Sequence, residues 1–308
     1  MRNSINHQLS LMFRRREFSI AFCSVVVFCT VAFFSAINTC WGTDKFQLLS
    51  ADSMFVGNAW FPMWPFFQYS FVFLVVVPYS MSYLNDRESE IISVILTRET
   101  KVQYYTALMA ACFVGNAVII FIPFCMNLGL CHLAFGREEN TIFGAYETWG
   151  YYQTLMGTNF AHPTLYQRLP LLKLYLFSSG LYNFVYIIFL SFVSGLFGVF
   201  VLCMSMCGIK SRAFLFTPLY ILWLISSVES EYSYSRAASG DGSFYVNYNF
   251  MDYLSANGGV GQNFVYFGTV LLAIVIFCVC IWIKQISIDE LGVRERRKDV
   301  GSGQKKYL

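Results

Sequence analysis

Six long apolar runs, separated by shorter polar segments, constrain this chain more than any other feature of its sequence. They lie at residues 18–38, 66–84, 104–130, 181–206, 213–228 and 264–284. About 20 apolar residues cross the hydrocarbon layer as a helix, and a helix satisfies its own peptide groups where lipid offers no partner. Only 13% of the residues are charged, against roughly 25% in soluble domains. We therefore predict an all-α, polytopic membrane protein with six transmembrane helices.

Two of these runs leave alternatives open. The fourth belongs to an apolar stretch that begins near Leu169, so residues 171–180 could instead form an interfacial helix. The fifth is short and contains Pro218. Without it, the C-terminus would lie on the other side of the membrane. The sequence lacks the alternating segments of about ten residues that mark outer-membrane strands.

Lysine and arginine fix the expected orientation, because cytoplasmic loops retain positive charge. Most of the 21 lysines and arginines fall in the segments that are cytoplasmic if both termini are inside. The outer segments hold only five, and their acidic residues outnumber these. We therefore expect both termini in the cytoplasm, and we interpret the basic ends as topology signals rather than as a nucleic-acid surface.

The N-terminal segment precedes the first span and carries Arg14, Arg15 and Arg16. The apolar run that follows is longer than the core of a signal peptide, so we interpret it as an uncleaved span. Upstream, Ile5, Leu9, Met12 and Phe13 recur at helical spacing, which suits an interfacial amphipathic helix over residues 1–17. A frayed basic tail is the alternative. Residues 285–308 are expected to form a basic cytoplasmic tail.

The sequence offers no catalytic or nucleotide-binding motif. The three histidines, His7, His132 and His162, match no metal-ligand pattern, and no GxSxG or GxxxxGK[ST] occurs. No ionisable residue lies near the middle of a predicted span, where coupled carriers usually place one. Most of the ten cysteines fall in or beside spans, where thiols pack as small hydrophobes. Cys40 and Cys131 lie near the outer interface and could pair only if the fold brings them together.

The segment between the second and third spans, YLNDRESEIISVILTRETKVQYY, gathers an unusual number of charges. Asn85 can cap a helix that carries Glu88 in its first turn, and Thr100 with Gln103 forms a T-x-x-Q capping box before the third span. We expect a short amphipathic helix, a break at residues 96–100 and a new helix beginning near Lys101. Such a helix can lie on lipid, close the inner end of the bundle, or fill a groove on a partner.

This segment resembles the loop between the second and third spans of ABC-2 type permeases, in which an acidic helix precedes an LTR or LSR triplet, a basic residue and aromatics. The matching residues are Asp86, Glu88, Glu90, Leu96, Thr97, Arg98, Lys101 and Tyr105. The family pattern also includes an interfacial N-terminal helix and an ordered polar segment between the last two spans. This chain departs from many members by Ile91-Ile92 after the acidic residues and by Glu99 after the arginine, which bears on the subfamily and the substrate.

The resemblance implies a six-helix permease domain over residues 18–284, with a coupling segment at 85–103. It implies a homodimer or a heterodimer with a second permease, bound to a separate ABC ATPase subunit that holds ATP and magnesium. The chain itself would hold no cofactor or metal and would not be an enzyme. The residues expected to contact the ATPase are Asp86, Glu88, Glu90, Ile91, Ile92, Ile95, Leu96 and Arg98.

The functional expectation is export of a substrate across a cell membrane, driven by ATP hydrolysed in the partner. The alternative is a polytopic membrane protein with a channel-like, sensory or assembly role and no ATPase; a membrane-embedded enzyme is the third class. The outer segments at 41–65, 135–168 and 231–253 are rich in aromatic residues. They suit an interfacial aromatic belt or, alternatively, an outer gate.

Overall fold

The structure is a computed structural model, and every helix or turn named below lies in the part of the chain that it describes. That part comprises residues 2–42, 51–52, 54–57, 63–80, 82–89, 91–135, 174, 178–207, 211, 213–239, 246–255 and 263–303. Its regular elements are all helices. Four of them are long and apolar enough to cross a membrane, at Arg16–Asn38, Lys101–Ala134, Ser179–Met206 and Phe264–Ser287. The prediction of an all-helical, multi-pass membrane protein is thus confirmed at this level.

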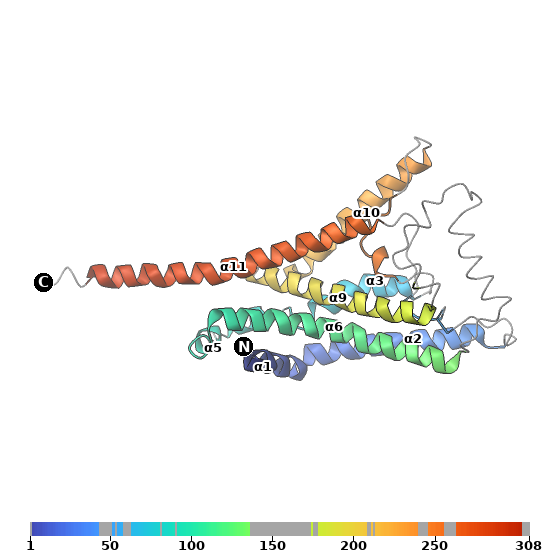
Figure 1. The fold of residues 1–308 in the computed structure, drawn as a ribbon, viewed down its shortest axis with the longest axis horizontal. Helices are drawn as coiled ribbons and strands as arrows, with labels where there is room; N and C mark the ends of the chain where they lie inside the picture. The colour runs from blue at the N-terminus through green and yellow to red at the C-terminus, as the bar shows by residue number, and fades with distance from the viewer. Residues whose placement is uncertain are drawn as a thin grey trace.

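Successive long helices run in alternating directions along the bundle (Figure 1). The order is α1 (Arg2–Arg14), α2 (Arg16–Cys40), α3 (Trp64–Val76), α4 (Ser82–Glu88), α5 (Ile91–Ile95), α6 (Lys101–Ala134), α9 (Ser179–Met206), α10 (Thr217–Ala238) and α11 (Phe264–Gly303). Two short 3-10 helices, η2 (Ala213–Leu215) and η3 (Asp252–Leu254), precede α10 and α11, respectively. The short helices α1, α4 and α5 lie at one end of the bundle, and the C-terminal part of α11 projects beyond that same end.

The second apolar run is not one helix, contrary to the expectation for residues 66–84. Helix α3 ends at Val76, residues 77–80 form a turn, and α4 begins at Ser82. Pro78 explains the interruption, because proline donates no backbone hydrogen bond and disfavours helix at the residue before it. The Ser80 hydroxyl donates to the carbonyl of Gly198 on α9, at 3.1 Å, and so secures the turn inside the bundle.

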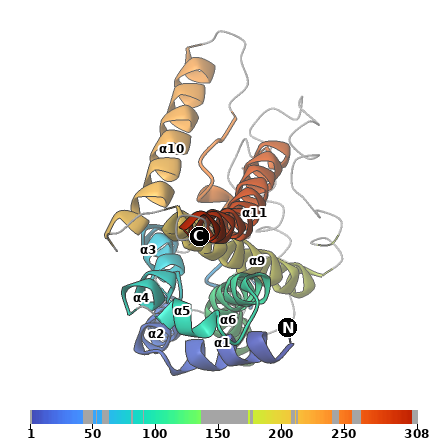
Figure 2. The same cartoon turned by 90° about the vertical axis from the view of Figure 1, so that its left-hand side faces the viewer.

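The last two helices extend beyond the apolar runs from which they were predicted. Pro218 stands at the start of α10, where its missing N–H costs nothing, so it begins this helix instead of kinking it. Helix α10 then continues through the polar residues Glu229 and Glu231 to Ala238. Helix α11 is continuous for 40 residues, well past the predicted end at 284. Figure 2 shows α10 standing away from the helices gathered around α6.

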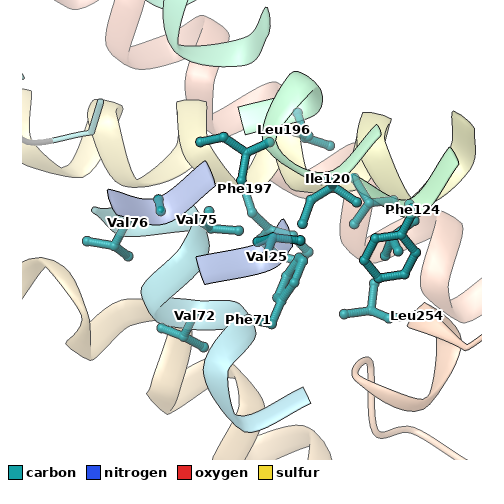
Figure 3. Packing of buried hydrophobic residues seen from close by; sticks show 14 of the residues in the cluster. Val25, Phe71, Val72, Val75, Val76, Ile120, Phe124, Leu196, Phe197 and Leu254 are labelled. Carbon is teal, nitrogen blue, oxygen red and sulfur yellow. The ribbon is translucent and has the colours of Figure 1, made fainter. Parts of the chain in front are cut away.

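The core lies between α2, α3, α6 and α9, and aromatic rings fill much of it (Figure 3). The ring of Phe67 lies 5.2 Å from that of Phe124, and Phe71 packs edge-on against Phe197. Leu254, from the segment before α11, reaches the same cluster. Because lipid is as apolar as these side chains, close van der Waals packing rather than escape from water holds such helices together.

Two glycines of α9, Gly195 and Gly198, bring α6 and α9 into close contact, and Gly115 of α6 faces α1 instead. A Cβ added at Gly195 would lie 2.8 Å from both the backbone oxygen and the ring of Phe113. One added at Gly198 would meet the side chain of Asn116. Small residues therefore set the distance between the two helices that form the centre of the bundle.

Candidate functional site

Helices α4 and α5 form the segment that the sequence marked as a candidate contact for a partner. Figure 2 looks onto this end of the molecule, with α5 beside α4 and α6. The predicted break is present: α5 ends at Ile95, residues 96–98 form a turn, and α6 begins at Lys101. Thr100 accepts from the backbone N–H of Gln103, and the Gln103 side chain accepts from the backbone N–H of Thr100. The capping box that begins α6 is therefore confirmed.

The predicted cap at Asn85 is wrong. Helix α4 begins three residues earlier, at Ser82, so Asn85 lies inside it. Its side-chain oxygen is buried and accepts no hydrogen bond from the described residues. The local pattern suggested a helix start at Asn85, but the turn at Pro78 ends α3 early and moves the new start toward the bundle.

The predicted contact residues divide into inward-facing and outward-facing groups. Ile92, Ile95 and Leu96 are partly buried and pack against the core cluster. Glu88 and Arg98 are exposed, as is Val94, which the sequence did not single out and which keeps 59% of its surface accessible. Glu90 and the side chain of Ile91 lie outside the described residues. The accessible surface of this segment, called the hairpin surface below, comprises Arg87, Glu88, Ser89, Val94, Thr97 and Arg98.

Asp86 faces the bundle and joins three elements. One of its carboxylate oxygens lies 3.4 Å from the guanidinium of Arg15, the residue between α1 and α2. The other accepts a hydrogen bond from the hydroxyl of Tyr104 on α6, at 3.0 Å. The Arg15 guanidinium also lies over the ring of Tyr79, 5.2 Å from its centroid. Asp86 therefore positions α4 against α6 and against the residue that joins α1 to α2.

Burial dominates the electrostatics of Asp86. It raises the pKa of this carboxyl above the ordinary value, and the Tyr104 hydrogen bond and the Arg15 charge oppose the rise without cancelling it. Removing a charged group from water disfavours its ionised form, and one cation 3.4 Å away compensates only in part.

Helix α1 packs against α6 through a face that includes Met12 of the predicted apolar set together with two polar residues. Ser4, Gln8 and Met12, spaced by four residues, are buried, whereas Phe13 is exposed. Gln8 accepts a hydrogen bond from the Tyr79 hydroxyl at 2.6 Å, and Met12 lies over Gly115 of α6. Helix α1 thus lies at the same end of the bundle as α4, and the turn at residues 77–80 contacts it through Tyr79.

A second polar cluster lies at the opposite end, and sequence reasoning did not assemble it. Its centre is Asp52, which follows α2 in the chain. One carboxylate oxygen accepts from the Ser179 hydroxyl at 2.6 Å, and the other lies 3.2 Å from Nε2 of His132. The Asn183 amide donates to the Asp52 backbone oxygen at 3.2 Å. The cluster thus joins the segment before α3 to the end of α6 and the start of α9.

Neighbouring residues hold the same segment more deeply in the bundle. Asn127 of α6 accepts from the backbone N–H of Val56 and donates to the backbone oxygen of Cys29 on α2. Cys131, whose thiol is free, donates to the backbone oxygen of Met54 at 3.6 Å. The side chain of Cys40 lies outside the described residues.

The sequence contains one signal for this cluster. Polar residues end the third predicted span and begin the fourth, at Asn127 and His132 and at Ser179 and Asn183. Consecutive antiparallel spans bring such ends together. Taken one at a time, these residues suggest only interfacial or packing groups, and nothing in the sequence indicates that Asp52 lies between them.

Other predicted features lie partly or wholly outside the described residues. These include most of the outer segments at 41–65 and 135–168, and most of residues 171–180. Within the described part, no three His, Cys, Asp or Glu side chains are grouped as a metal site would require. No family model, characterised protein or solved structure matches this chain.

Proposed function

We propose that this chain is the membrane-spanning permease subunit of an ABC-2 type transporter, and that a separate ATPase subunit supplies the energy. The observation that best supports the proposal is the hairpin surface. A short helical hairpin at the end of a membrane bundle exposes Glu88, Val94 and Arg98, while its inner face is fixed to the core through Ile92 and Ile95. An element with one exposed and one anchored face is suited to transmit a partner's movement.

The proposed topology has six passes, with both termini and the hairpin in the cytoplasm. Helices α2, α6, α9 and the first part of α11 supply four passes. In the proposal, α3 with its following turn and α10 supply the other two. The direction of transport is proposed to be export, with the permease acting as a pair, as the resemblance implies.

The proposed mechanism requires the ATPase to bind one state of the bundle more tightly than another, because a ligand shifts a conformational equilibrium only through such a difference. Closure of the ATPase would move α4 and α5. Asp86 connects α4 to α6 and to Arg15, so the movement would reach α6, α1 and α2 together. A passage between the two permeases would then open.

Co-purification from native membranes tests this proposal. We expect the tagged chain, extracted in mild detergent, to bring down a soluble protein with nucleotide-binding motifs, identified by mass spectrometry. Val94→Asp should abolish the association, because it places a charge on the exposed hairpin surface without disturbing the core. The matched control is Leu133→Asp, which changes an exposed residue at the other end of α6 and should leave the association unchanged.

The alternative function, a membrane protein that works without an ATPase, makes the opposite prediction. In that case no ATPase would co-purify in any of several detergents, and Val94→Asp would change nothing in the set of associated proteins. Retention of the ATPase by Val94→Asp would refute the assignment of the hairpin surface, but not the association itself.

A further inference from the structure

Residues 51–57, without residue 53, form a non-helical segment buried among helices; we call it the inserted segment. Phe55 and Val56 are completely buried, and Ala51 and Met54 keep 1% and 6% of their surface accessible. The Phe55 ring packs edge-on against Phe124 of α6, 6.1 Å between centroids. A connection between α2 and α3 would ordinarily cross the surface, because buried non-helical backbone needs internal hydrogen-bond partners. Here the bundle supplies them.

The hydrogen-bond partners of the inserted segment come from α6 and α9, and one of them also binds α2. Asn127 of α6 accepts from Val56 and at the same time donates to Cys29 of α2. At the outer edge, His132 of α6 and Ser179 of α9 both contact the carboxylate of Asp52. If the start of α9 moved away from the end of α6, His132 or Ser179 would therefore have to release Asp52.

Two polar atoms near Asp52 find no hydrogen-bond partner in the described part of the chain. The side-chain oxygen of Asn183 and Nδ1 of His132 are buried and have no hydrogen-bond partner among the described residues. Asn183 keeps only 2% of its surface accessible. Each such group costs free energy when buried, so releasing Asp52, which lets water reach these two atoms, costs less than releasing a fully satisfied contact. The pattern suits a contact that can be made and released.

We propose that the inserted segment is a plug that reversibly closes the end of the bundle between α2, α6 and α9, and that the contacts of Asp52 hold it there. Asp52 binds His132 of α6 and Ser179 and Asn183 of α9. Release of Asp52 opens the interior at Cys131 and Asn127 to water. This inference does not depend on an ATPase partner.

The native thiol of Cys131 reports directly on the plug, because it is fully buried and donates to Met54 of the inserted segment. The experiment measures its reaction with a water-soluble maleimide in isolated membranes, with the labelled peptide identified by mass spectrometry and Cys131→Ser as the blank. In the wild-type protein the reaction should be slow. Asp52→Asn, which removes the charge and keeps the shape, should accelerate it about tenfold, the effect of losing one charge-assisted hydrogen bond from the closed state.

Ser179→Ala provides a second, milder variant, which removes one contact to Asp52 and should also accelerate labelling. Glu231→Gln, an exposed acidic residue of α10, is the matched control and should label as slowly as the wild type. Only proteins that remain monodisperse after extraction are compared. Rapid labelling of wild-type Cys131, or unchanged protection in both Asp52→Asn and Ser179→Ala, would overturn the proposal.

Discussion

Among single residues, Asp86 shows that the contacts of a charged side chain do not follow from its local sequence. The resemblance to ABC-2 permeases implies a contact with an ATPase at this residue. In the structure it is bound to Arg15 and Tyr104. The Arg15 contact could not be inferred locally, since Arg15 lies 71 residues away in the chain. Glu88 and Arg98, its neighbours in the same stretch, do face outward.

The raised pKa of Asp86 predicts a particular pH dependence. Because burial raises this pKa in the folded state, the folded protein binds a proton more readily than the unfolded chain. The contribution of Asp86 to stability therefore falls as the pH rises from the ordinary carboxyl pKa of 3.8 through the folded-state pKa. Asp86→Asn lacks this dependence. The melting temperature of Asp86→Asn, relative to that of the wild type, should thus be highest near neutral pH and decline toward acidic pH.

A second variant checks the cause of that dependence. Tyr104→Phe removes a hydrogen bond that lowers the pKa of Asp86, so stability should fall more steeply with rising pH than in the wild type. Thermal unfolding in detergent, from acidic to neutral pH, measures the pH dependence of stability for both variants. A gap between Asp86→Asn and the wild type that stays constant with pH would contradict the assignment.

Among the helices, the strongly apolar ones follow well from the sequence, including α6, which contains Pro123, and the predicted bounds fail at Pro78 and Pro218. Helices α2, α6 and α9 begin and end close to the predicted bounds, and the Thr100–Gln103 box marks the start of α6 correctly. Pro78, by contrast, divides the second run, and Pro218 starts α10. Composition gives the length of an apolar run, but it does not tell whether a proline interrupts a helix, begins one or lies inside one, as Pro78, Pro218 and Pro123 do here.

The contact between α6 and α9 supports a prediction about its glycines. Gly195→Ala should destabilise the bundle by about 1–3 kcal/mol, the usual cost of overpacking, because the new methyl group would collide with the backbone of Phe113. Gly129→Ala is the matched control on α6, where the new methyl group would have no atom within 4 Å of it. It should stabilise the helix by roughly 0.5–1 kcal/mol. Chemical or thermal unfolding in detergent gives both values, and equal effects would refute the close contact.

For the bundle as a whole, the helical architecture follows from hydrophobicity alone, but neither polar cluster does. The ends of α6 and α9 are polar in the sequence, yet only the fold brings Asp52 between them. Likewise, the amphipathic pattern of α1 predicts an interfacial helix, but it does not predict that Ser4, Gln8 and Met12 are buried against the bundle. Long-range pairings between polar groups are not encoded in local periodicity.

The proposed topology predicts where water-soluble reagents reach the chain. Epitopes added to either terminus should be accessible only from the cytoplasm, and so should a tag inserted beside Thr97 in the hairpin turn. Protease protection in sealed cells and in inverted vesicles distinguishes the sides. A C-terminal epitope exposed outside the cell would mean that one of α3 and α10 does not cross, and the six-pass arrangement would be wrong.

Photo-cross-linking in living cells, from a light-activated residue at position 94 on the hairpin surface, tests most directly whether this chain works with an ATPase. We predict a covalent adduct with a soluble ATPase that carries nucleotide-binding motifs, and no such adduct when the same residue replaces Leu133 at the other end of α6. If position 94 yields only lipid or self-adducts while the protein is inserted normally, the hairpin contacts no ATPase, and the chain is not the permease proposed here.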